Sequence, residues 1–181
     1  IAEFRKLAPA GAQFFGYGHR VSFGVIAKEA VIGKELAEAA AFDASVYDQQ
    51  GCLSPHVFYV EKRAREFAAM LAEAMAAYQA RVPRGKLTTE ESAAIAQLRQ
   101  AYEFRSASDQ RVAVWTGDGW TLICNDDLVF TPSCLNRSVF VKPIDSIKCV
   151  IDSVRGLAGR ISTIGLAPMN EFAGDLSEIG V

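Results

Sequence analysis

The sequence is poor in histidine, lacks paired cysteine motifs and contains no long uninterrupted apolar run. Only two histidines, His19 and His56, occur among 181 residues, and no two of the four cysteines form a Cys-x-x-Cys pair. A zinc-type site needs clustered cysteine and histidine ligands, so we expect no metal. No apolar run approaches the roughly 20 residues needed to cross a bilayer, and no signal peptide is evident, so we expect no membrane span.

The sequence also lacks a large excess of charge of either sign. The formal net charge is −2 and no block or stripe of lysine and arginine occurs, which argues against a nucleic-acid partner. Half of the residues are hydrophobic and 22% are charged, as in a single packed domain. A chain of this size builds a core without disulfides, so a reduced, cytoplasmic protein is the simpler interpretation. The chain starts at Ile1 inside a helix-like segment and stops at Val181 without a polar tail, so we expect both ends to be cut from something longer.

The periodicity of apolar residues predicts alternating strands and helices. Strands are expected at 21–27, 56–61, 137–144 and 161–167, with a further pair inside 111–126 around the turn signal Gly117-Asp118-Gly119. Helices are expected at 34–48, 62–82, 91–107, 146–157 and 168–180, the third opened by Thr88-Thr89-Glu90-Glu91, in which a threonine serves as N-cap. This order predicts an α/β fold: a mostly parallel sheet flanked by helices, with an edge hairpin and a helical insertion at 62–108.

Cys52 is the main candidate for chemistry, because it lies in a glycine- and proline-marked loop between a helix and a strand. A reactive cysteine needs exposure, and a loop supplies it. Gly51 lets the backbone approach a substrate, and the amides of Cys52 and Leu53 could bind an oxyanion. The alternative is a partly buried structural thiol at a turn.

The other candidates have simpler explanations. Cys124 and Cys149 fall on apolar faces and are expected in the core, whereas Cys134 is expected in a loop. The segment Gly16-Tyr17-Gly18-His19 precedes a strand and lacks the Lys-Ser/Thr pair of a phosphate loop. The adjacent acids Asp126 and Asp127 are expected at the solvated surface.

The segment around Cys52 resembles known enzymes. DQQGCLSPHVFYVE resembles the nucleophile segment of aldehyde dehydrogenase-like enzymes, and its double Gln with Cys-x-Ser-Pro is similar to LuxC-type acyl-CoA (fatty acyl) reductases. GYGHRVSFGVI upstream and RSVFVKPI and ISTIGLA downstream extend the resemblance over most of the chain, least over 65–110. The resemblance implies that residues 1–181 form one catalytic domain, with an N-terminal NADP-binding Rossmann-like domain absent from the chain.

The resemblance also implies a mechanism. Cys52 would attack the thioester of an acyl-CoA or acyl carrier, supported by Gln50, Gly51 and Leu53 in its loop, and NADPH would reduce the acyl-enzyme to an aldehyde. NADPH would be bound mainly by the missing domain, so no cofactor-binding residue is assigned here, and a homo-oligomer is possible. The turn at 15–20 lacks the water-activating glutamate of hydrolytic aldehyde dehydrogenases, and the Glu-x-Phe-Gly-Pro segment has no clear counterpart near 137–140. These departures favour thioester chemistry over release of a free acid.

Three other hypotheses remain open from the sequence. The chain could act as a CoA-acylating aldehyde dehydrogenase. It could be a cysteine hydrolase or acyltransferase, which would require His19 or His56 within hydrogen-bond reach of Cys52. It could also be a non-catalytic domain, in which case Cys52 would be buried and unreactive.

Overall fold

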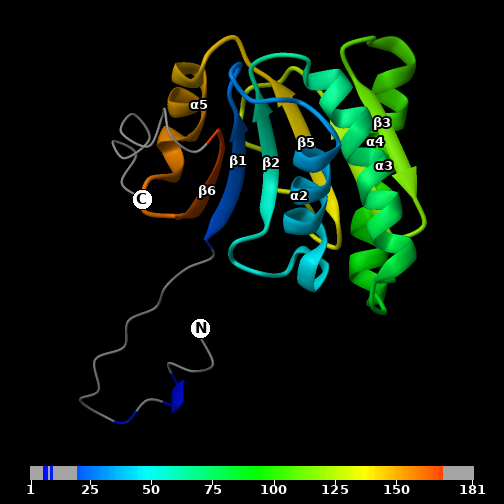
Figure 1. Ribbon diagram of the computed structural model, residues 1–181. Coiled ribbons are helices and arrows are strands. Elements are labelled where there is room, and N and C mark those ends of the chain that lie inside the picture. The colour runs from blue at the N-terminus through cyan, green and yellow to red at the C-terminus, as the bar shows by residue number, and fades with distance from the viewer. Residues whose placement is uncertain (1–5, 8, 10–19, 169–181) are drawn as a thin grey trace.

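The computed structural model describes residues 6, 7, 9 and 20–168 (Figure 1). The strands are β1 (Val21–Ile26), β2 (Pro55–Val60), β3 (Ala113–Gly117), β4 (Trp120–Cys124), β5 (Ser138–Pro143) and β6 (Ile161–Ala167). The helices are α2 (Lys34–Ser45), α3 (Ala64–Arg81), α4 (Thr89–Ser108) and α5 (Ile147–Val154), with 3-10 turns η1 (Val46–Gln49) and η2 (Arg155–Leu157). The helix expected at 168–180 and the turn containing His19 lie outside the described residues.

The six strands form one sheet in the order β3-β4-β5-β2-β1-β6. Every neighbouring pair is parallel except β3 and β4, which form an antiparallel hairpin at one edge. Gly117 pairs with Trp120, and Gly119 between them has a φ of 113°, a value that favours glycine. The predicted α/β class, the edge hairpin and the helical insertion between β2 and β3 are thereby confirmed.

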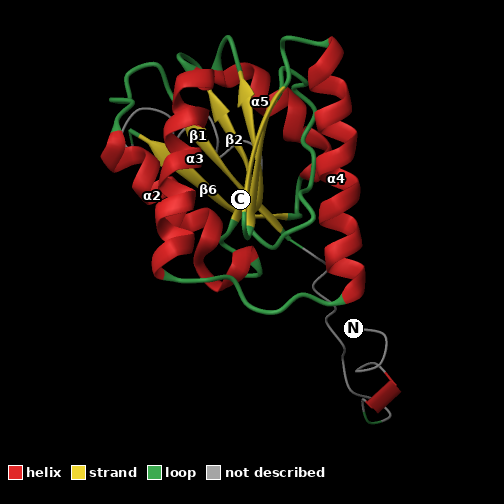
Figure 2. Cartoon of the chain, turned by 90° about the vertical axis from the view of Figure 1, so that its right-hand side faces the viewer, coloured by secondary structure: helices red, strands yellow, loops and turns green. Residues whose placement is uncertain are grey.

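Helices cover both faces of the sheet, which gives three layers (Figure 2). Small residues of α2 and larger ones of α3 pack on one face, because in each helix the buried positions recur every three or four residues. The members of this cluster include Ala40, Ala41 and Ala44 from α2 and Phe67, Leu71 and Met75 from α3. Gly24 belongs to this packing: a Cβ there would lie 2.5 Å from the Phe58 ring.

The opposite face packs against α5, α4 and the long connection between β4 and β5. Alternation along β2 sends Val57 and Tyr59 to this face and Phe58 and Val60 to the other. Residues Ile147, Val150 and Val154 supply the buried stripe of α5. Both faces are therefore buried, which explains the continuous apolar runs of the parallel strands.

The β4–β5 connection, residues 125–137, crosses this second face and is fixed by polar side chains of the sheet. The fully buried Lys142 ammonium donates to the carbonyls of Asp127 (2.5 Å) and Val129 (2.8 Å) and to Thr131 Oγ1 (3.1 Å). Burial lowers the pKa of Lys142 to about 8. The connection delivers residues 133–137 to the start of β5.

The structure shows where three of the four cysteines lie relative to the core. Cys124 is buried in β4, and burial raises the pKa of its thiol to about 11, as expected for a core cysteine. Cys149 was expected in the core but is only half-buried on α5, where its sulfur lies 3.6 Å from Ser146 Oγ. The reason is that its neighbour Val150 takes the inward position of this short helix. Cys134 is a half-buried loop thiol, and Asp126 and Asp127 are exposed, as predicted.

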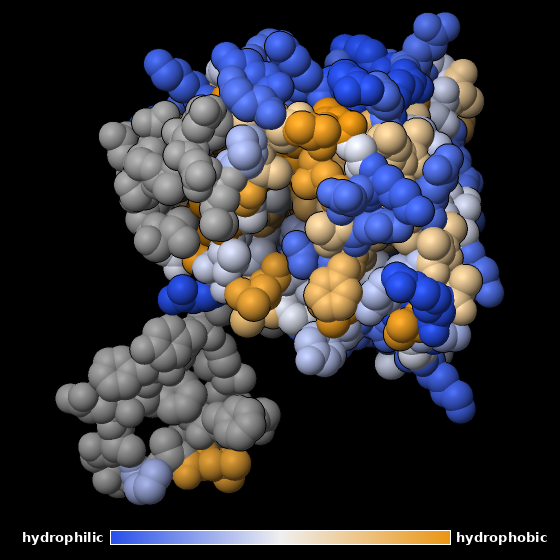
Figure 3. Space-filling model, viewed as in Figure 1, coloured by the Kyte–Doolittle hydropathy of each residue, from blue (hydrophilic) through white to orange (hydrophobic). Residues whose placement is uncertain are grey.

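A pocket of about 180 Å³ lies between α2, β1 and β6. Its walls are apolar apart from Asp43, whose pKa is raised by burial. Figure 3 shows apolar side chains reaching the surface between charged ones on the face that carries α2 and β6. The β6 residues that line the pocket, Gly165 to Ala167, end that strand, so the pocket is remote from the strand starts where Cys52 lies.

Candidate active site

Cys52 lies on an exposed turn at the edge of the sheet where the parallel strands begin. It is exposed to solvent, between η1 and the first residue of β2. The Ser54 N–H donates to the Gly51 carbonyl (3.0 Å), and Ser22 Oγ at the start of β1 donates to the Cys52 carbonyl (2.6 Å). The backbone of Cys52 is thus held from its own turn and from a neighbouring strand, while its thiol faces outward.

The N–H groups of this turn are available to a ligand. Neither the Cys52 nor the Leu53 amide donates a hydrogen bond to another residue within 20–168. The Leu53 side chain is 65% exposed and does not cover the turn. A turn that presents a thiol and two free amides together can bring a nucleophile and oxyanion donors to one carbonyl group.

The segment before Cys52 has an unusual backbone. A single helix was predicted over 34–48, but α2 ends at Ser45, and Tyr47, Asp48 and Gln49 have φ values of 51°, 53° and 64°. The residues before β5 show the same pattern, with φ values of 62°, 54° and 63° at Leu135, Asn136 and Arg137. Left-handed conformations are unfavourable for residues other than glycine, so tertiary contacts must stabilise both runs.

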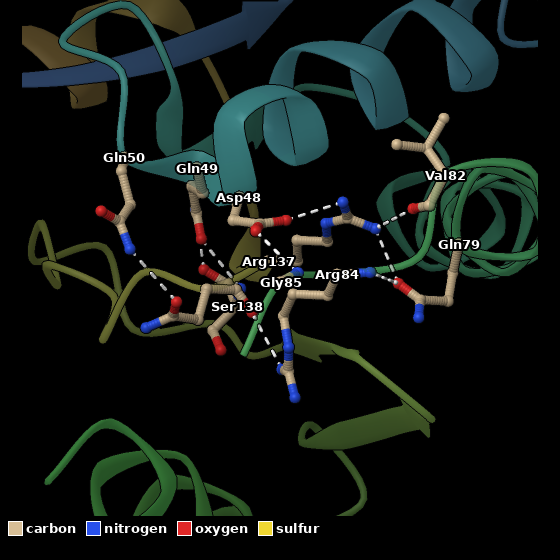
Figure 4. A network of polar contacts seen from close by, with 10 residues as sticks. Asp48, Gln49, Gln50, Gln79, Val82, Arg84, Gly85, Arg137 and Ser138 are labelled. Atoms are coloured by element: carbon tan, nitrogen blue, oxygen red, sulfur yellow. Dashed lines mark hydrogen bonds and ion pairs between the residues drawn. The ribbon is translucent and has the colours of Figure 1, made fainter. Parts of the chain in front are cut away.

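Those contacts join the two runs to each other (Figure 4). Asp48 forms an ion pair with the buried Arg137 (2.7 Å), and the Gly85 N–H donates to the same carboxylate (2.9 Å). Arg137 also donates to Gln79 Oε1 (2.6 Å) and the Val82 carbonyl (2.8 Å). The ion pair explains why α2 stops early: Asp48 must turn back to meet Arg137.

Gln49 is the most completely buried polar side chain of the segment. Its Nε2 donates to the carbonyls of Pro55 and Ser138, both at 2.8 Å, and its Oε1 accepts from the Ser138 N–H at 2.8 Å. It therefore ties the two ends of the Cys52 turn to β5. Sequence reasoning did not select Gln49 or Arg137, and the only available signal was the polar run Asp-Gln-Gln ahead of the cysteine.

Gln50, predicted to support the loop, directs its side chain away from Cys52. Its Nε2 lies 3.4 Å from both Glu91 Oε1 and Asn136 Oδ1, and Asn136 Nδ2 donates to the same Glu91 oxygen (3.3 Å). Hydrogen bonds from the Thr88 N–H and from Asn136 lower the pKa of Glu91. The carboxylate that contacts this loop is therefore already engaged and is a weak base.

His56, the histidine that the structure describes, is engaged away from the thiol. His56 Nδ1 accepts from the Ser133 N–H (3.1 Å) and lies 3.0 Å from Ser133 Oγ, and burial lowers the pKa of the ring. Because Nδ1 is an acceptor, the ring is neutral with its proton on Nε2. The structure thus engages His56 with Ser133 and Phe130 rather than with Cys52. His19 lies outside the described residues.

Two further properties of the described part concern metals and membranes. Within residues 20–168 no three side chains of the histidine, cysteine, aspartate and glutamate types gather as metal ligands would. Over the same range no helix combines the length and apolar character that a bilayer-spanning segment requires.

The fold is that of the aldehyde dehydrogenases. The structure matches KauB, an aldehyde dehydrogenase of Pseudomonas aeruginosa, with a TM-score of 0.62 at 11% identity over 85% of this chain and 39% of that one. It also matches the NADP-dependent glyceraldehyde-3-phosphate dehydrogenase of Bacillus halodurans C-125, with a TM-score of 0.59 at 12% identity over 87% and 40% of the two chains.

Sequence comparison assigns the chain to a family within this fold. The model of the LuxC acyl-CoA reductase family matches residues 1–181, and the chain belongs to this family. It is 25% identical to the long-chain acyl-protein thioester reductase of Vibrio harveyi over 150 residues, which are 82% of this chain. The chain spans about a third of that relative's length.

Proposed function

We propose that the chain is the nucleophile-bearing domain of a reductase that converts a fatty acyl thioester, as acyl-CoA or acyl carrier, to an aldehyde. The exposed Cys52 thiol, on a turn with two free amides, is the observation that carries the proposal. Membership of the LuxC family and the aldehyde dehydrogenase fold support it.

In the first step the Cys52 thiolate attacks the thioester carbonyl carbon. The amides of Cys52 and Leu53 hold the oxygen as it becomes negative, and the donor thiolate leaves and takes a proton from solvent. The product is an acyl group bonded to Cys52 sulfur. The hydrogen bond from Ser22 Oγ engages the Cys52 carbonyl and fixes the backbone of the turn during this step.

The second step requires a hydride, which NADPH supplies when bound. A hydride, which carries both electrons, would be transferred to the acyl carbon; the carbon–sulfur bond would then break with its electron pair left on Cys52 as thiolate, and the aldehyde would be released. Residues 132–137 offer no carboxylate to grip a ribose, and the Ser133 hydroxyl is already engaged by His56 and the Leu135 N–H. Residues 132–137 therefore do not by themselves complete a nicotinamide site, and we propose that the cofactor is bound mainly by a separate N-terminal domain of the full protein.

Water competes with reduction for the acyl group, and the surroundings of Cys52 disfavour water. Deacylation by water needs a base, and Glu91 is held by Thr88, Asn136 and Gln50 with a lowered pKa. The same reasoning weighs against a cysteine hydrolase, because His56 is engaged by Ser133.

Intact-mass measurement tests the proposal. We expect a long-chain acyl-CoA to add one acyl group to the chain, hydroxylamine to release it, Cys52→Ala to abolish it, and Cys134→Ala to leave it unchanged. If no adduct forms, the measurement is repeated with NADPH on the protein that joins this chain to its cofactor domain. Absence of acylation at Cys52 there would refute the proposal and favour a structural thiol.

A further inference from the structure

Three arginines, Arg84, Arg99 and Arg137, lie near one another around the residues that precede β5 and have no role in the steps above. Arg137 is neutralised by its ion pair with Asp48. Arg99 donates to Thr121 Oγ1 (2.8 Å) and to the carbonyls of Gly117 (3.0 Å) and Trp120 (2.8 Å), which are all uncharged acceptors. Its charge is held in place but not cancelled by a direct ion pair.

Arg84 lies in the connection between α3 and α4, and its guanidinium makes the fewest hydrogen bonds of the three. Its backbone is fixed by the Arg84 N–H to Gln79 Oε1 hydrogen bond (3.2 Å), but its guanidinium makes one long hydrogen bond, from Nη1 to the Asn136 carbonyl (3.4 Å). Its Nε is buried without a partner, and no carboxylate of the described residues lies within 4.0 Å of the group. Figure 4 shows the side chain extending away from the Asp48–Arg137 pair, with a dashed line at its guanidinium for the long hydrogen bond from Nη1.

The electrostatic surroundings of Arg84 match this geometry. Burial and the positive charges of Arg99 and Arg137 lower its pKa, and they outweigh the opposing effect of the Asp48 and Asp118 carboxylates. A half-buried guanidinium next to other cations, with open donors, lacks an anion. Glu91, the further carboxylate that Arg84 influences, is committed to Thr88 and Asn136.

Arg84 is also connected to the nucleophile turn. It contacts the Asn136 carbonyl, the Asn136 side chain contacts Gln50, and Gln50 precedes Cys52 by two residues. Even with the side chains and backbone along this path fully extended, the Arg84 guanidinium lies within about 20 Å of the Cys52 thiol. An anionic group bound at Arg84 can therefore belong to a molecule whose reacting end is at Cys52.

We propose that Arg84, with Arg99 and Arg137 behind it, binds a phosphate group of a substrate that enters the Cys52 site. The proposal rests on the function proposed above. A planar guanidinium with free donors suits two phosphate oxygens, and the charge of Arg99, which no direct ion pair cancels, stabilises the second negative charge. The phosphate has two possible sources, the thioester donor (acyl-CoA or a carrier's phosphopantetheine arm) and NADPH, which share this chemistry.

Acylation of Cys52 by donors with and without phosphate tests the proposal. The donors are acyl-CoA and the acyl-N-acetylcysteamine thioester, which lacks phosphate. For a donor phosphate, Arg84→Gln should raise the acyl-CoA concentration for half-maximal acylation about tenfold, the scale of one lost charged hydrogen bond, and leave the phosphate-free donor unaffected. Arg84→Lys keeps the charge and should give an intermediate value. The matched control is Arg81→Gln, which removes an exposed charge at the end of α3 and should change neither donor.

Calorimetric binding in the Cys52→Ala background separates this proposal from the proposed function. Weaker CoA binding with Arg84→Gln supports a donor phosphate even if the wild type is never acylated, which would refute only the reductase. Weaker binding of NADPH but not of NADH supports the phosphate site and assigns it to the cofactor. Unchanged affinity for both CoA and NADPH in Arg84→Gln and Arg84→Lys would overturn the proposal.

Discussion

Gln49 shows how one buried amide can organise a reactive turn. From a left-handed conformation, its side chain bonds the Pro55 carbonyl and both backbone groups of Ser138 at the start of their strands. Two residues farther along, Cys52 has no such constraint on its side chain. The turn therefore combines a rigid base with an exposed sulfur.

Gln49→Ala should destabilise the protein markedly. It removes the side-chain donor to the buried Pro55 and Ser138 carbonyls, whereas the Ser138 N–H keeps the Leu135 carbonyl as acceptor (3.1 Å), so the free energy of unfolding should fall by about 2 kcal/mol or more. Gln50→Ala, which removes an exposed amide with long contacts only, should change it by less than about 0.5 kcal/mol. Urea unfolding compares the two, and equal midpoints would contradict the clamping role of Gln49.

Lys142 should make stability depend on alkaline pH. Burial lowers its pKa from 10.5 to about 8, so between these values the unfolded chain binds a proton that the folded chain does not. Wild-type stability should therefore increase relative to Lys142→Met as pH rises from 8 to 10.5, and the difference should be constant below pH 7. Urea unfolding at pH 6.5, 7, 9 and 10.5 measures this difference, and a decrease across the alkaline window would exclude a lowered pKa.

At the scale of elements, the start of α4 links the helical insertion to the candidate site. Thr88 Oγ1 accepts from the Glu91 N–H (3.2 Å), and Glu91 Oε2 accepts from the Thr88 N–H (2.8 Å), which completes a capping box. The other oxygen of Glu91 contacts Asn136 and Gln50. The cap thus holds the helix and orients a carboxylate toward the Cys52 turn.

Thr88→Ala should weaken this link. Loss of the cap should cost about 1 kcal/mol of unfolding free energy, and release of Glu91 should move its pKa upward toward the ordinary range. Thr89→Ala, one residue later and outside the box, is the matched control. Thermal unfolding and NMR titration of the Glu91 side chain give the two readouts, and an unchanged Glu91 pKa would show that the cap does not hold the carboxylate.

At the scale of the whole molecule, the sequence predicted the layers but not how the loops meet. Buried strands such as β2 were predictable because apolar runs end at proline or glycine, and the exposed turn carrying Cys52 followed from them. The pairing of Gln49 with Ser138 joins positions 89 residues apart, and no local pattern encodes it. The left-handed run at Tyr47 was missed for the same reason, because tertiary contacts override the helical preference there.

The pairing of β1 with β6 has a mechanical consequence. These strands lie side by side and parallel from Val21 with Ile161 to Ile26 with Ala167, and they are the first and last strands of the described chain. A force that pulls residue 20 and residue 168 apart acts along the ladder rather than across it. The hydrogen bonds between β1 and β6 are then loaded in shear and must break together rather than one after another. The sheet therefore resists stretching in this direction.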